Sequence, residues 1–166
     1  PSTGGATLET CVSESHELIH GTCVAFGPYG ALLRGASGSG KSDLALRFIA
    51  LPAEGGHAPM LVADDQIFVE ARGNGLFAAA PPTIAGKLEV RGIGIIELPY
   101  VARAELVLAV DLVPAQAVPR MPPEPWEQTM IAGKSVPCLA LAPFEASAPL
   151  KLKLALFRAA HDRGGA

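Results

Sequence analysis

The sequence predicts an α/β protein built around a mixed, partly antiparallel sheet with few helices. Of its 166 residues, 49% are hydrophobic but only 5% are aromatic, so we expect an interior of Ala, Val, Leu and Ile. Turn signals at 27–30 and 73–75 lie between short apolar runs and indicate hairpins, whereas a Rossmann-type domain alternates strands and helices more regularly. A glycine-rich stretch at 35–40 lies between a predicted strand and a predicted helix.

In the first half of the chain, strands at 18–26 and 31–34 would pair as a hairpin around the turn at 27–30. A helix is predicted at 42–51, because its apolar residues repeat with the spacing of one helix face and Pro52 follows. Three further strands are predicted, at 60–63, 66–71 and 76–80.

In the second half, residues 88–97 are strand-like despite two glycines, and strands are predicted at 105–113 and 136–141. The proline-rich stretch 114–125 is predicted to be a loop. Leu150, Leu154 and Phe157 have the spacing of a helix face, although the alternation over 150–154 also fits a strand. We therefore predict one domain, with boundaries at 1–17 for an N-terminal extension, 18–160 for the folded domain and 161–166 for a tail.

Charge and cysteine content limit the classes of function. The formal net charge of −3 argues against a nucleic-acid partner, which would favour a basic stripe. No apolar run approaches the roughly 20 residues of a membrane helix, and residues 1–5 lack the features of a signal peptide. Cys11, Cys23 and Cys138 form no C-x-x-C pair and are expected to be free thiols, so we predict a cytoplasmic protein.

Residues 35–42 match the phosphate-loop pattern G-x-x-x-x-G-K-[ST] at every fixed position. Glycines let the backbone wrap around phosphate oxygens, and the following helix directs its positive end towards them. In this pattern Lys41 reaches the β- and γ-phosphates of ATP and Ser42 is a ligand of Mg²⁺. The predicted nucleotide-binding residues are Gly35, Ala36, Ser37, Gly38, Ser39, Gly40, Lys41 and Ser42.

Two acidic positions could complete such a site. Asp111 ends the apolar run 106–110 and is, by pattern alone, the more ordinary Walker B candidate; it could equally be a strand-end residue that begins a turn. Asp64 and Asp65 follow the run 61–63, and adjacent carboxylates there repel each other unless a cation balances them. On an extended strand their side chains would point to opposite faces. The pair could also be a solvated turn.

Three further polar residues each allow a structural and a functional interpretation. His20 lies on the strand that leads into the first hairpin, where a single histidine is more often structural than catalytic. Glu89 and Arg91 are two positions apart, so on a strand they would share a face, and a surface ion pair explains them equally well.

Together these motifs resemble the catalytic domain of the HPr kinase/phosphorylase family over roughly residues 18–160. The likeness rests on His20-Gly21 ahead of the phosphate loop, on Val62-Ala63-Asp64-Asp65, and on residues 88–97. The last stretch, LEVRGIGIIE, is similar to the family signature E-[IV]-R-G-x-G-I-I and includes Arg91, Gly92 and Gly94.

The resemblance implies a serine protein kinase that phosphorylates HPr or an HPr-like phosphocarrier of the sugar phosphotransferase system. It implies a P-loop fold similar to that of phosphoenolpyruvate carboxykinase, with ATP and Mg²⁺ as cofactors and a hexamer as the assembly. By position, His20, Lys41, Asp64, Asp65 and Arg120 match catalytic residues of the family. The aspartate pair would supply the base, and Ser42 and Glu89 would be Mg²⁺ ligands.

The chain also departs from the family pattern. We expect a short form that lacks the N-terminal domain of full-length members. Where the family carries an arginine linked to the reverse, phosphorolytic reaction, residues 142–147 have none, so we expect little phosphorylase activity. Two alternatives remain: a small-molecule kinase or NTPase that uses Asp111, and a non-catalytic nucleotide-sensing module that acts through a signalling partner.

Overall fold

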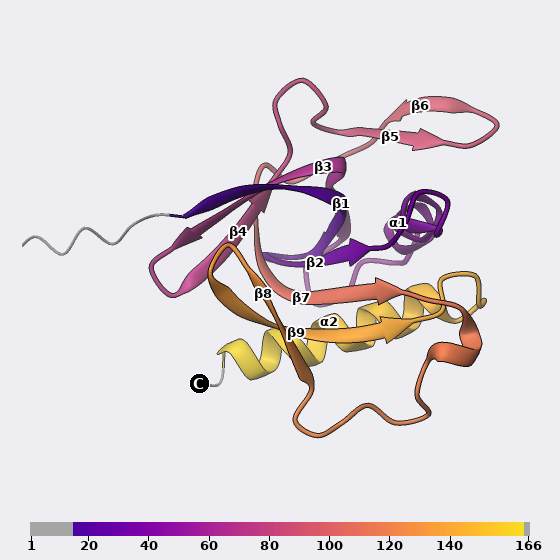
Figure 1. Cartoon of the computed structure of the whole chain (residues 1–166). Coiled ribbons are helices and arrows are strands. Elements are labelled where there is room, and N and C mark those ends of the chain that lie inside the picture. The colour runs from indigo at the N-terminus through magenta and orange to yellow at the C-terminus, as the bar shows by residue number, and fades with distance from the viewer. Residues whose placement is uncertain (1–14, 165–166) are drawn as a thin grey trace, which may run out of the picture.

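A computed structural model describes residues 15–164 and shows a seven-stranded mixed sheet, two α-helices and a separate two-stranded hairpin (Figure 1). The elements are β1 (His16–Phe26), β2 (Tyr29–Arg34), α1 (Lys41–Ile49), β3 (Pro59–Arg72), β4 (Gly75–Ala79), β5 (Lys87–Val90), β6 (Gly94–Glu97), β7 (Ala104–Leu112), the 3₁₀ helix η1 (Ala115–Ala117), β8 (Glu127–Ile131), β9 (Lys134–Leu141) and α2 (Ala148–Gly164).

The strand order in the large sheet is β2-β1-β3-β4-β7-β9-β8, and β2 also pairs with β7. The first five strands in this order therefore form a closed ring, in which β2 and β7 are the two ends that pair. β2 pairs with β7, and β7 with β9, in parallel, whereas the other pairs are antiparallel. The predicted mixed sheet is confirmed. The carboxyl ends of β2, β7 and β9 meet at one edge, so the loops that follow them are neighbours.

The hydrophobic core has two parts because strands bury alternate residues on opposite faces. Leu32 of β2 belongs to the cluster inside the closed ring, with Val62 and Ile67. Its neighbour Leu33 packs on the other side, against Phe48 of α1 and the residues of α2. Burial on both faces explains why the strands read as continuous apolar runs.

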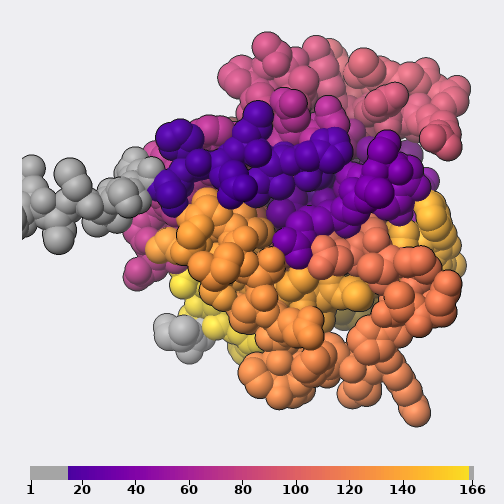
Figure 2. Space-filling view, in the orientation of Figure 1, coloured from indigo at the N-terminus to yellow at the C-terminus, as the bar shows by residue number. Residues whose placement is uncertain are grey.

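The predicted strands differ from the structure in three places. The runs at 60–63 and 66–71 form one continuous strand, β3, so the Asp64-Asp65 pair lies within a strand and not at its end. Residues 88–97 fold back as the β5–β6 hairpin because the turn at residues 91–93 contains Gly92, whose φ is +86°. This hairpin stands above the main body of the molecule in Figure 2. β8 was not predicted.

The final helix is confirmed, but its predicted buried face was wrong. Leu152, Leu156 and Ala159 pack against the sheet, whereas Leu150 and Leu154 are exposed. The helix continues through Gly164, so residues 161–164 are helical and not a tail. The predicted extension is described only from residue 15, and Cys11 lies outside the described residues. Within residues 15–164, neither helix combines the length and apolar character needed to cross a membrane.

Candidate active site

The glycine-rich loop (residues 35–42) joins β2 to α1, as predicted. Gly40 occupies the N-cap of α1 with φ +97°, a conformation that L side chains rarely adopt. A Cβ at this position would also come within 3.0 Å of the Phe144 ring. The motif's glycine is therefore required both by the backbone and by the close approach of Phe144.

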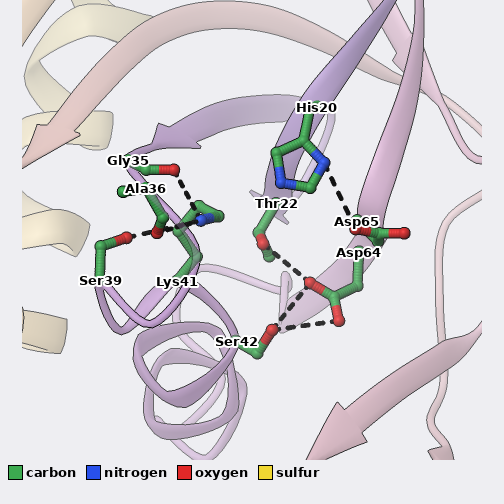
Figure 3. A network of polar contacts seen from close by, with 9 residues as sticks. All are labelled: His20, Thr22, Gly35, Ala36, Ser39, Lys41, Ser42, Asp64 and Asp65. Carbon is green, nitrogen blue, oxygen red and sulfur yellow. Dashed lines mark hydrogen bonds and ion pairs between the residues drawn. The ribbon is translucent and has the colours of Figure 1, made fainter.

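Lys41 is folded back into this loop (Figure 3). Its Nζ donates hydrogen bonds to the carbonyl oxygens of Gly35 at 2.7 Å and Ala36 at 2.9 Å, and it lies 3.5 Å from the Ser39 hydroxyl. The side chain is only 8% exposed. Because an ammonium group has three donors and no acceptor, these contacts hold its charge inside the curl of the loop.

Asp64 links the sheet to the start of α1. One carboxylate oxygen accepts a hydrogen bond from the Thr22 hydroxyl at 2.8 Å. The Ser42 hydroxyl lies 3.0 and 3.1 Å from the two carboxylate oxygens. The residue is 8% exposed. A hydroxyl and a carboxylate in contact supply the hard oxygen atoms that Mg²⁺ prefers, so Ser42 and Asp64 fit a magnesium site completed by phosphate oxygens and water.

Asp65 points away from this contact, and its backbone explains why. Its φ is +73°, which is uncommon for a residue other than glycine, and its side chain is 72% exposed. Its carboxylate lies 3.3 Å from Nδ1 of His20 on the neighbouring strand β1. Gly21 of β1 lies opposite Asp65 in the strand pairing. A larger residue would not fit at position 21, because its Cβ would lie 2.9 Å from the Leu33 carbonyl oxygen. The prediction that the two carboxylates point to opposite faces was wrong, because both line the same cleft and Asp65 interrupts the regular alternation of the strand with a left-handed backbone.

These side chains surround one cleft of about 690 Å³, between the glycine-rich loop, the middle of β1 and β3, and the β5–β6 hairpin. It brings together most of the predicted site residues, and adds Thr22 and Phe144, which sequence reasoning missed. The predicted residues that line it are His20, Ser37, Gly38, Gly40, Lys41, Ser42, Asp64, Asp65, Glu89, Arg91, Gly92 and Gly94.

A model of one protein family, the HPr Serine kinase C-terminal domain, matches residues 12–111. The chain belongs to this family. The resemblance stated from the motifs is therefore confirmed, and the cleft just described is the candidate active site of an HPr serine kinase C-terminal domain.

Individual relatives agree with this assignment. The HPr kinase/phosphorylase of Clostridium tetani is 37% identical over 95 residues, which is 57% of this chain and 29% of that protein. The HPr kinase/phosphorylase of Mycoplasmopsis pulmonis is 39% identical over 80 residues, 48% of this chain and 24% of that protein. The solved structure of the HPr(Ser) kinase/phosphatase from Coxiella burnetii matches with a TM-score of 0.73 and 25% identity, over 90% of this chain and 93% of that one. In contrast, this chain matches less than a third of the length of the two curated relatives.

The expectation that Glu89 and Arg91 share a strand face was wrong. Glu89 is exposed on β5, but Arg91 lies in the turn that follows, so the two do not share a strand face. Both still line the cleft, because the hairpin that carries them contacts α1 and β3.

Arg120 and Asp111 lie elsewhere. Arg120 is exposed in the loop between β7 and β8 and does not line the cleft. Asp111 lies opposite Arg34 in the β2–β7 pairing, and its carboxylate accepts from Arg34 Nε at 2.7 Å and Nη2 at 3.1 Å. This hydrogen bond raises the pKa of the Arg34 guanidinium. Asp64, and not Asp111, is therefore the acid that contacts Ser42.

Proposed function

We propose that this domain transfers the γ-phosphoryl group of ATP to a serine of HPr or of an HPr-like phosphocarrier protein. One observation carries the proposal: a single cleft holds Lys41 in its glycine-rich loop, the Ser42–Asp64 contact and the exposed Asp65. The family relationship supports HPr as the partner, since the names of the relatives state that they act on it.

The residues divide into two functions. The loop amides and Lys41 would bind the phosphates and stabilise the charge that develops on them. Ser42 and Asp64 would hold Mg²⁺, with Glu89 facing the same cleft. When bound, this ion would neutralise charge on the β- and γ-phosphoryl oxygens.

Asp65 is the better candidate for the base. It is exposed to the cleft and has the His20 imidazole as its polar neighbour, whereas both oxygens of Asp64 are already engaged. The incoming serine hydroxyl would give its proton to Asp65 while its oxygen forms the bond to phosphorus and ADP leaves. The left-handed backbone at Asp65 supports this role, because unusual backbone conformations cluster at functional positions.

We propose that the reverse, phosphorolytic reaction is weak. Phosphate attacking a phosphoserine needs cationic partners, and the cations near residues 142–147 already have acidic or carbonyl partners. Lys151 pairs with Glu145 at 2.6 Å, and Lys153 pairs with Glu54 at 3.0 Å. Arg47 donates to the carbonyl oxygens of Pro143 and Glu145 and pairs with Asp43.

Three further expectations remain proposals. The sheet would be of the kind shared with phosphoenolpyruvate carboxykinase. The protein would act in the cytoplasm. It would assemble as a homo-oligomer, a hexamer in the family, which light scattering after gel filtration would measure.

The release of ADP separates this function from its alternatives. The purified domain is mixed with Mg²⁺ and ATP, with and without HPr, and ADP is followed in a coupled assay. A protein kinase releases ADP at an appreciable rate only when HPr is present. Release without HPr would favour an NTPase, and nucleotide binding with no release under either condition would favour a sensing module.

A further inference from the structure

A second concave surface lies on the other side of the glycine-rich loop. It is an apolar groove of about 570 Å³, formed by the segments that follow β7 and β9 together with one residue of the loop. The lining residues are Ser39, Leu112, Val113, Pro114, Ala115, Ala142, Pro143, Phe144 and Glu145.

The topology of the sheet explains the position of this groove. β2, β7 and β9 are parallel neighbours, so the segments that follow them leave the sheet at the same edge. The first of these segments is the glycine-rich loop, and the other two form the groove. In sheets with parallel strands, ligands bind in the crevice beyond the carboxyl ends of the strands.

Phe144 joins the groove to the phosphate cleft. Its side chain lines both, and it packs on Gly40 where a Cβ would touch the ring. The residue is 71% exposed, so most of this large aromatic side chain is available for contact with a ligand. The loop also contributes to both sides, since Gly38 and Gly40 line the cleft and Ser39 lines the groove.

The groove offers apolar contact with little competing charge. Among residues 15–164, Glu145 is the only charged residue that lines the groove, and Lys151 pairs with its carboxylate at 2.6 Å. The segment is held in place because Arg47 donates to the carbonyl oxygens of Pro143 and Glu145. A flat, weakly polar group could therefore enter without leaving a buried charge unpaired.

We propose that this groove binds the purine base of the nucleotide, with the base stacked on Phe144. The proposal rests on the proposed function, which places the triphosphate in the adjoining cleft. A nucleoside triphosphate has one highly charged end and one flat aromatic end. The protein presents matching surfaces, polar and apolar, on the two sides of one loop.

The test compares two ligands by titration calorimetry in the presence of Mg²⁺: ATP, and inorganic tripolyphosphate, which has the phosphates but no base. Two variants of the full chain address the groove. Phe144→Ala removes the stacking surface, and Ala115→Trp fills the groove. Leu154→Ala and Ala117→Trp are matched controls, because Leu154 is exposed on α2 and Ala117 lies on η1, and neither lines the groove.

In the wild type, ATP should bind more tightly than tripolyphosphate. Both groove variants should weaken ATP binding by about tenfold, the order of effect seen when an aromatic stacking partner of a base is removed, and leave tripolyphosphate binding unchanged. The controls should match the wild type for both ligands.

Equal affinity of the wild type for ATP and tripolyphosphate would overturn the base site while leaving the phosphate site intact. Equal loss of both ligands in Phe144→Ala and Ala115→Trp would also overturn it, because the groove would then be acting on the phosphates. So would unchanged ATP binding in both variants, which would leave the groove to another occupant such as a second protein chain. Absence of binding of either ligand to the wild type would refute the phosphate site, and with it the proposed function.

Discussion

Exchanging each carboxylate of the aspartate pair for an amide should separate the two roles that the structure gives them. Asp64 accepts hydrogen bonds from the Thr22 and Ser42 hydroxyls and is almost completely buried. A hydrogen bond to a charged group contributes about 1.5–3 kcal/mol and a neutral one about 0.5–1.5 kcal/mol, so Asp64→Asn should lower the free energy of unfolding by about 2 kcal/mol.

Asp65→Asn should behave differently. Its carboxylate and the His20 ring are 72% and 62% exposed, so their contact should contribute less than about 0.5 kcal/mol to the free energy of unfolding. Asparagine also tolerates a positive φ, so the backbone need not change. If Asp65 is the base, however, the rate of HPr phosphorylation should fall by about 10²- to 10⁴-fold, with ATP affinity unchanged.

Two measurements on each variant test this contrast. Urea titration gives the free energy of unfolding, and a phosphorylation assay at saturating ATP gives kcat. The assignment would be refuted if Asp65→Asn kept a rate within about threefold of wild type while Asp64→Asn, still folded and binding ATP, was inactive.

Other expected outcomes follow from individual contacts. Lys41→Ala should weaken Mg²⁺–ATP binding at least tenfold, about 1.4 kcal/mol, and unchanged calorimetry would remove the phosphate site. Asp111→Asn should lower the free energy of unfolding by about 1 kcal/mol in urea and leave kcat unchanged; an inactive but folded variant would restore Asp111 as the acid. Burial raises the pKa of the Cys23 thiol from 9.0 to about 12, so the unfolded chain releases this proton first. The free energy of unfolding should therefore fall between pH 9 and 12, more steeply in the wild type than in Cys23→Ala. With serine-phosphorylated HPr and millimolar phosphate, pyrophosphate should form far more slowly than phosphoserine does in the forward reaction.

Sequence reasoning worked best where the chemistry is local. The glycine-rich loop and the start of α1 are encoded by eight consecutive residues, whose glycines are required by backbone angles and by close packing. The hairpins also depend on short turn signals. The site residues of these segments could therefore be predicted from spacing alone.

It failed where distant contacts decide the outcome. The buried face of α2 depends on how the helix lies on the sheet, which selects Leu152 and Leu156 over the equally apolar Leu150 and Leu154. β8 is polar and lies at the sheet edge, so neither hydrophobicity nor alternation marked it. β3 continues through its two aspartates because β1 pairs with it on both sides of them, from Pro59 to Glu70.

Sequence reasoning missed two site residues, Thr22 and Phe144, for different reasons. Thr22 lies two positions after His20 on the same strand, so the period of an extended chain does place both on the side of the cleft. Phe144 gave no such signal, because it follows β9 in a loop and reaches the cleft only through the parallel pairing of β7 with β9.

The mass of HPr after incubation with the domain, Mg²⁺ and ATP tests the central claim most directly. The account predicts that HPr gains one phosphoryl group, that peptide mapping places it on a serine, and that Lys41→Ala abolishes the gain. HPr of unchanged mass, in the presence of a folded domain that binds ATP, would contradict it.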